Sequence, residues 1–353
     1  MSEQTPVPQA TTSPADEHRR VESVEGAPRG SAFGRFMSSS AGRNVGLVVA
    51  LLVLCVVGAA TTGQLFVDVD NAMTILRYAS VIGVVAIGMT FVVTGGGFDL
   101  SVGAIVALAS IWSTTVATQT MAQDFHWIVM VFTAIAVGAG CGLVNGVLIA
   151  YGKMAPFIAT LAMMAAARGL AEMISDKRTQ LVDVQGFGDF FSGDFLGLPV
   201  LVWIFAVVCA VAWVLLNRTT FGRRTIAVGG NATAARLAGI AVNRHTVLLY
   251  VLVGVACGIA AVMLTARTST GSAQHGLLYE LDAIAMVVIG GTLLGGGRGT
   301  IVGTIFGVLI FSTLTNVFTL NNLDTSTQAV AKGAIIVIAV LLQQRVAARS
   351  DTS

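Results

Sequence analysis

Ionisable side chains inside apolar segments are the residues of this sequence whose chemistry needs an explanation. Asp99 follows three consecutive glycines in the otherwise apolar stretch 90–110. Arg168 and Glu172 stand four positions apart in one apolar run, and Lys332 lies in the last. A charge in hydrocarbon is costly unless it is paired or hydrated, so such residues mark either structural pairs or the path of a polar solute or ion.

Motifs for other kinds of chemistry are missing. We find no GxxxxGK[ST] phosphate loop, so we expect no ATP bound through such a loop. HExxH, CxxC and GxSxG are absent too, and we expect no catalytic residue, metal site or bound cofactor. The four cysteines lie singly in apolar runs, which is typical of small core residues. A membrane-embedded enzyme is an alternative that no motif supports.

The composition is that of a membrane protein. Of 353 residues, 55% are hydrophobic and 11% charged, whereas an ordinary soluble domain has about 25% charged residues. The net charge of +2, with no basic stripe, argues against a nucleic-acid partner. We therefore expect an all-α polytopic membrane protein.

About ten transmembrane helices are predicted from the apolar runs, and some are too short for a straight span of roughly 20 residues. The runs near Gly95 and Gly295 are expected to be broken or re-entrant. The ten runs are 45–62, 80–93, 101–118, 127–151, 156–174, 198–217, 246–266, 281–294, 300–317 and 328–342.

The distribution of lysine and arginine orients these spans. With the N-terminus in the cytosol, fourteen basic residues fall in cytosolic segments and about four outside. This bias favours ten spans with both termini cytosolic. Residues 1–44 are predicted to be a disordered cytosolic tail, 45–342 the transmembrane domain and 343–353 a short cytosolic tail.

The stretch "TGGGFDLSVG" permits two compatible interpretations. It is a capped turn, with Asp99 or Ser101 at the start of a helix, or a loop that borders a translocation path. Residues 289–307 resemble it, because "AIGM", "GGG" and "VG" recur as "AIAM", "GGG" and "VG". Whether this is a true internal repeat stays open.

The inner loop 218–245 has five arginines and no acid. Asn231 is predicted to cap a short helix over 232–238 that Gly239 closes. Its small apolar face suits docking into a groove of a partner. The alternative is a loop that lies on anionic lipid headgroups.

Three further features have a structural and a functional interpretation. Arg168 and Glu172 share a helix face and can neutralise each other. Lys332 must snorkel or meet an oxygen of another helix. Glu280 and Asp282, in the first turn of a helix at the outer mouth, either favour the helix start or contact a partner or solute.

Four segments together resemble the permease subunit of ribose-type ABC sugar importers, over roughly residues 75–342. They occur in the family's order and at similar spacing. They are "GMTFVVTGGGFDLSVGAIVALAS", "GLVNGVLIAYGKMAPFIATLAMMAAARGLAEMIS", "FGRRTIAVGGNATAARLAGIAVNRHTVLLYVLVG" and "YELDAIAMVVIGGTLLGGGRGTIVGTIFGVLIFSTLTN".

The resemblance implies a permease in a bacterial plasma membrane that works by alternating access around a cavity between two permease subunits, a second copy or a paralogue. It implies a solute-binding protein that delivers a monosaccharide or polyol outside. It also implies a cytosolic ATPase with two nucleotide-binding domains, which uses ATP and Mg. The longer N-terminal tail departs from the family pattern, and the segment 268–280 does not name a sugar.

Two sets of site residues are predicted, from the resemblance and from the polar residues of the apolar segments together. The ATPase-docking loop corresponds to Gly222, Arg223, Arg224, Gly229, Gly230, Asn231, Arg236, Leu237 and Gly239. The translocation path or gate is assigned to Thr94, Gly95, Gly96, Gly97, Asp99, Ser101, Asn145, Arg168, Glu280, Asp282, Gly296 and Lys332. The alternative function is an ion-coupled secondary transporter that needs no ATPase, which Asp99, Glu172 and Lys332 motivate.

Overall fold

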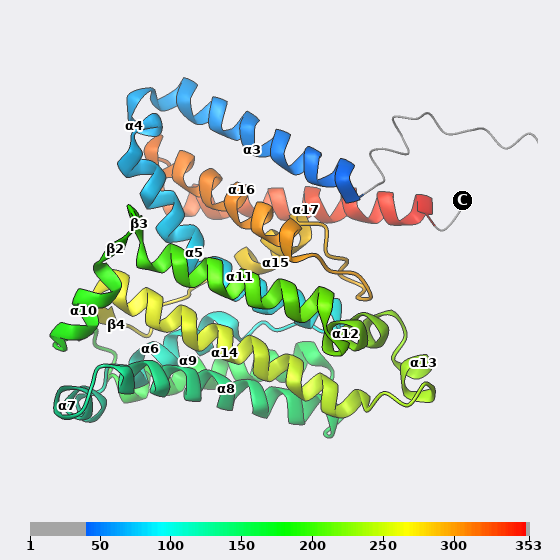
Figure 1. Cartoon of the computed structure of the whole chain (residues 1–353), viewed down its shortest axis with the longest axis horizontal. Helices are drawn as coiled ribbons and strands as arrows, with labels where there is room; N and C mark the ends of the chain where they lie inside the picture. Colours follow the sequence, from blue (N-terminus) through cyan, green and yellow to red (C-terminus); the bar gives the residue numbers. More distant parts are fainter. Residues whose placement is uncertain (1–39, 351–353) are drawn as a thin grey trace, which may run out of the picture. The chain divides into compact units, whose positions relative to one another are not determined.

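The chain folds almost entirely into helices (Figure 1). The computed structural model describes residues 40–350. The chain divides into two units after Arg43, and the bundle of helices forms the second of them. The elements are α3 (Ser40–Thr62), α4 (Gln64–Val67), α5 (Val69–Thr94), α6 (Val102–Ser113), α7 (Val116–Asp124), α8 (Ile128–Ala150), α9 (Pro156–Ile174), β1 (Gln180–Leu181), α10 (Gln185–Ser192), β2 (Asp194–Phe195), β3 (Leu198–Pro199), α11 (Val200–Arg218), α12 (Thr220–Gly230), α13 (Ala232–Leu237), α14 (Val242–Thr268), β4 (Thr270–Gly271), α15 (Tyr279–Ile289), α16 (Ile301–Leu320) and α17 (Thr325–Ser350).

The all-α polytopic membrane fold is confirmed, but ten full-length spans are not. Seven of the described helices are long and apolar enough to cross a membrane, and the pair α6–α7, bent by 56°, is an eighth candidate if it forms one broken span. Each of the ten predicted apolar runs corresponds to a helix, yet α15 has only 11 residues. In α17 the apolar part is Thr325–Ile338. The count falls because α15 and the apolar part of α17 are short and because α6 qualifies only together with α7. Glycine loops do precede α6 and follow α15, as the sequence predicted.

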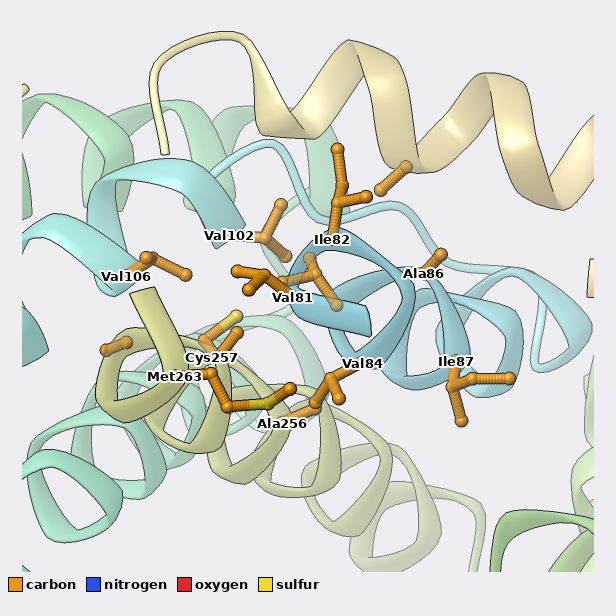
Figure 2. Close-up of a cluster of buried hydrophobic side chains, with 14 of the residues drawn as sticks. Val81, Ile82, Val84, Ala86, Ile87, Val102, Val106, Ala256, Cys257 and Met263 are labelled. Carbon is orange, nitrogen blue, oxygen red and sulfur yellow. The ribbon is translucent and has the colours of Figure 1, made fainter. Parts of the chain in front are cut away.

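Helix α5 lies at the centre of the bundle. All sixteen residues from Ala79 to Thr94 are buried, and the helix packs against α14, α16, α11 and α15. Figure 2 shows Val81 and Val84 of α5 among side chains of α6 and α14, including Val106, Cys257 and Met263. A helix that is apolar on every side is suited to this position, because its whole circumference meets other helices.

Helices α8 and α14 form the most extensive helix pair and run side by side (Figure 1). Glycines bring their backbones together, since a Cβ on Gly138 or Gly142 would overlap the carbonyl oxygen of Gly254 or Tyr250. Close approach through small residues four apart is the usual packing of helices in lipid, where apolar surface alone gives no net attraction between helices.

The outer loop between α9 and α11 contains the short strands and the small helix α10. Strand β1 pairs antiparallel with β4, and β2 pairs antiparallel with β3. Phe190 and Phe191 of α10 pack on Trp127 with ring centroids 4.9 and 5.6 Å apart. Aromatic rings of this kind favour the membrane interface.

The ends of the described chain bear on the predicted boundaries. Most of the predicted N-terminal tail, residues 1–39, lies outside the described residues. At the other end, α17 continues to Ser350, so the segment predicted to be a short C-terminal tail is largely the continuation of the last helix.

Candidate functional site

Three glycine segments from distant parts of the sequence meet in what we call the glycine junction: Gly95–Gly97 after α5, Gly229–Gly230 at the end of α12, and Gly295–Gly297 before α16. The backbone N–H of Gly297 donates to the carbonyl oxygen of Thr94 at 2.9 Å. A Cβ on Gly229 would overlap that same carbonyl, and it would lie 2.6 Å from Gly297 N. Only residues without a side chain permit this approach.

The junction joins the two stretches that resemble each other in sequence. In the first, α5 ends at Thr94 and α6 begins at Val102. In the second, α15 ends at Ile289 and α16 begins at Ile301. Both are helix–glycine loop–helix units, and Gly96 and Gly296 both adopt positive φ, 82° and 83°. The structure therefore supports an internal repeat of two broken helices whose glycine loops touch.

The predicted docking loop consists of two short helices. The Asn231 side chain accepts from Ala234 N at 2.9 Å, and Gly239 has φ 83°, so both predicted ends of α13 are confirmed. Ala235 is buried, whereas Leu237 is 85% exposed. A leucine this exposed beside arginines is available to another surface.

Two of the predicted docking residues face inward instead of outward. Gly222 is buried, because its Cα approaches the backbone of Leu216. Gly229 contacts Thr94 and Gly297 in the glycine junction. Arg223, Arg224 and Arg236 are exposed. The loop thus has an outward face near Leu237 and an inward face at Gly229.

Asp99 is completely buried in a small polar cluster between α5 and α8. Its Oδ1 accepts from the backbone N–H of Ser101 at 2.8 Å and from the Ser101 hydroxyl at 2.5 Å. Asn145 Nδ2 donates to the Ser101 hydroxyl oxygen at 2.9 Å. Asp99 Oδ2 and Asn145 Oδ1 have no hydrogen-bond partner in the described residues. Asp99 therefore organises the turn before α6, while its own second oxygen and the side-chain oxygen of Asn145 lack donors among the described residues.

Arg168 does not pair with Glu172 as expected. It donates through Nη1 to the carbonyl oxygens of Ala273 and, at 3.1 Å, His275, and no ion pair joins it to Glu172 within residues 40–350. His275 Nδ1 lies 2.8 Å from the Ser110 hydroxyl. Burial, Arg267 and Arg168 lower the pKa of His275 to about 4, so its ring is neutral at pH 7. Arg168 therefore holds the outer loop before α15.

Lys332 meets a carboxylate of another helix, as its isolation predicted. Its Nζ lies 3.2 Å from Asp282 Oδ2 and 5.1 Å from the centre of the Phe311 ring. Both charged side chains are mostly buried, with 17% and 8% of their surface exposed. Glu280 is half-buried, and a Cβ on Gly103 would lie 2.6 Å from its Oε2. The outer acids thus contact α17 and the start of α6.

The predicted path residues do not form one site in this conformation. Thr94, Gly96 and Gly296 meet in the glycine junction, Asp99, Ser101 and Asn145 form the buried cluster, and the charged residues lie around the outer loop and α15. A transport role for them stays a prediction. Sequence reasoning missed the hydroxyl pair of Thr90 and Thr304, 2.8 Å apart between α5 and α16. Both halves of the suspected repeat contain further threonines, such as Thr94 and Thr300, so nothing in the sequence pairs Thr90 with Thr304.

Known proteins match this chain along most of its length. The family model for the permease component of branched-chain amino acid transport systems matches residues 71–340. The ribose import permease protein RbsC of Bacillus subtilis (strain 168) is 42% identical over 303 residues, 85% of this chain and 91% of that protein. No solved structure matches the chain.

Two relatives from Escherichia coli (strain K12) extend the comparison. Its ribose import permease protein RbsC is 39% identical over 304 residues, 84% of this chain and 92% of that protein. Its L-arabinose transport system permease protein AraH is 36% identical over 327 residues, 91% of this chain and 95% of that protein.

Proposed function

The chain belongs to the family of permease components of branched-chain amino acid transport systems, and from this membership we propose that it imports a monosaccharide or a related polyol. Relatives that match most of its length are named for ribose and L-arabinose. It is a multi-pass membrane permease of an ABC importer. We further propose that a solute-binding protein delivers the sugar from outside and that a separate ATPase, with two nucleotide-binding domains, uses ATP and Mg inside.

The observation that carries the proposed coupling to an ATPase is the continuity between the exposed helix α13 and the glycine junction. Leu237 of α13 is exposed, and Asn231, which caps α13, directly follows α12, whose Gly229 touches Thr94 and Gly297. A push on α13 therefore reaches the loops at which two broken helices meet. Packed backbones shift as units because they cannot be compressed.

In the proposed mechanism, ATP binding by the partner moves α12 and α13 against the two glycine loops. The half-helices that follow these loops, α6 and α16, then change their tilt. A second permease subunit would complete the path, since the buried polar residues Thr94, Asp99 and Asn145 are closed off within this one. No chemical step on the sugar is required of this chain.

The docking role is tested with Leu237→Asp in the complete transporter. We expect this variant to insert into the membrane but to retain less than about a tenth of the ATPase on co-purification, because a charge replaces an apolar side chain in a desolvated contact. Leu181→Asp, the same change at a residue of the outer loop that is 74% exposed, should leave ATPase retention unchanged. Full retention by Leu237→Asp would contradict the docking role.

The ion-coupled alternative is tested with the isolated chain. We expect no sugar uptake by vesicles that contain this chain alone under a proton or sodium gradient. Uptake should require the ATPase, the binding protein and ATP. Gradient-driven uptake without these partners would overturn the proposal.

A further inference from the structure

A basic hollow lies at the cytosolic end of the α8–α14 pair. It has a volume of about 800 Å³, and its lining includes Lys153, Arg236 and Arg244 together with Tyr151 and Asn243. None of the described residues that line it is acidic. The three cations come from three places in the fold: the segment after α8, the end of α13 and the first turn of α14.

The cations of this hollow are not neutralised by the protein. Ion pairs within residues 40–350 engage other side chains and leave Lys153, Arg236 and Arg244 unpaired. The hollow also includes the N-terminus of α14, a helix of 27 residues. Ala241 occupies its N-cap position, so no side chain caps the first N–H groups. The N–H of Val242 donates to the carbonyl oxygen of Ile240 at 2.8 Å. The helix dipole and three cations together favour an anion at this end of α14.

The residues around the hollow are of the types that contact a lipid. Leu148 of α8 and Leu248 of α14 lie within two positions of residues that line the hollow, belong to membrane-spanning helices, and are 36% and 52% exposed. Tyr151 is 56% exposed beside them and has the amphipathic ring that favours the headgroup level. A phospholipid combines the two matching chemistries: its anionic headgroup complements the cations of the hollow, and its acyl chains complement the exposed apolar side chains.

We propose that this hollow binds the phosphate group of an anionic phospholipid of the cytosolic leaflet, with its acyl chains along α8 and α14. Basic pockets between transmembrane helices on the cytosolic side bind anionic headgroups. Arg236 links the site to α13, because it lies in the last turn of that helix. A bound lipid would fix the position of α13 against α14. The site does not depend on the identity of the transported sugar.

The test uses the full chain in detergent and native mass spectrometry with phosphatidylglycerol and phosphatidylcholine. We expect retained phosphatidylglycerol in the wild type and little phosphatidylcholine. In Lys153→Gln/Arg236→Gln/Arg244→Gln, affinity should fall about fivefold for each charge removed. The control Arg218→Gln/Arg223→Gln/Arg298→Gln loses the same charge outside the hollow and should retain the lipid. Equal retention by the two triple variants would overturn the proposal.

Two further arms identify the ligand. Glycerophosphoglycerol carries the same phosphodiester without acyl chains, and we expect it to displace phosphatidylglycerol only at a large excess. Displacement at equal concentration would assign the hollow to a soluble phosphate compound and overturn the lipid site. Arg236→Lys/Arg244→Lys should keep most of the lipid, and its failure to do so with the fold intact would contradict recognition by charge.

Discussion

At the scale of single residues, Asp99 shows how a carboxylate can be kept in the interior of a membrane protein. One of its oxygens accepts two hydrogen bonds from Ser101, and Asn145 extends the cluster through the same hydroxyl. The other oxygen, Oδ2, is buried without a donor in the described residues. A buried acceptor left without a partner costs about 1–3 kcal/mol. Asp99 therefore contributes through the turn it organises, while its second oxygen opposes folding.

We predict opposite effects for two substitutions of Asp99. Asp99→Asn keeps an acceptor for Ser101 and removes a buried charge, so the solubilised protein should melt at the same temperature or higher. Asp99→Ala leaves the Ser101 N–H without an acceptor and should lose about 1–3 kcal/mol. Thermal unfolding in detergent measures both. If Asp99→Asn were as destabilising as Asp99→Ala, the negative charge itself would be required, which points to a bound cation.

The same scale shows which contacts a sequence can predict. Asn231 and Gly239 fix the ends of α13 through bonds within a few residues, so pattern alone located them. Lys332 was predicted to need a distant partner, though Asp282 was not identified as that partner. The partners of Arg168 are the backbone carbonyls of Ala273 and His275, more than a hundred residues away. Every residue has a backbone carbonyl, so the sequence does not single out these two. Among side chains, it offered only the nearby Glu172 as a candidate partner.

At the scale of elements, the glycine junction explains why two apolar segments are interrupted. Each glycine loop ends one helix and lets the next begin at another angle, and the two loops rest on Gly229 of α12. A broken helix in a membrane must have its free backbone groups covered by protein. The bond from Gly297 N to Thr94 O does this for one such pair.

Adjacent glycines of α12 offer a matched test of the junction. A methyl group on Gly229 would overlap the backbone at Thr94, whereas one on Gly230 has only Gly297 Cα nearby, at 3.9 Å. Overpacking of this kind costs roughly 1–3 kcal/mol. We therefore expect Gly229→Ala to reduce ATP-driven sugar uptake severalfold and Gly230→Ala to leave it near the wild-type rate. Uptake assays in vesicles with the complete transporter measure both.

The pair also separates the junction from ATPase docking. If Gly229 acts through the junction, Gly229→Ala should lose uptake while the ATPase still co-purifies, because Leu237 keeps its exposed position. Loss of the ATPase from Gly229→Ala would show that α12 is part of the docking surface. Equal uptake by the two variants would contradict the close approach at Gly229.

At the scale of the whole molecule, hydropathy located every major helix but overcounted the full-length spans. Each apolar run became a helix because lipid and helix interfaces both select apolar side chains. Composition cannot say whether an apolar run crosses the membrane as a helix alone or needs flanking non-helical chain to complete the crossing. Arg77 of α5 and Asp194 of β2 lie 3.6 Å apart, in segments that the charge bias assigns to one side. The number of segments that cross the membrane is tested by finding on which side of the membrane each loop lies.

Single cysteines labelled with a membrane-impermeant maleimide test whether the short helix α15 takes part in a crossing. The background replaces Cys55, Cys141, Cys209 and Cys257, which are free and at least partly buried. By alternation of the ten runs, Leu237→Cys and Arg298→Cys should react only in inverted vesicles. Leu181→Cys, Gln274→Cys and Asp324→Cys should react from outside, in intact cells.

Arg298 decides the result, because it lies between α15 and α16. Its reaction from inside means that the chain crosses between Gln274 and Arg298 with only the 11 residues of α15 in helical form. The remaining thickness would then be spanned by the flanking loops, which the protein interior must cover. Reaction of Arg298→Cys from outside, with Leu237→Cys reacting from inside, would contradict the contact between Gly297 and Gly229 of the inner loop and would make α15 a re-entrant helix. Leu237→Cys provides the matched inner control, since the run between it and Gln274 is the unbroken helix α14.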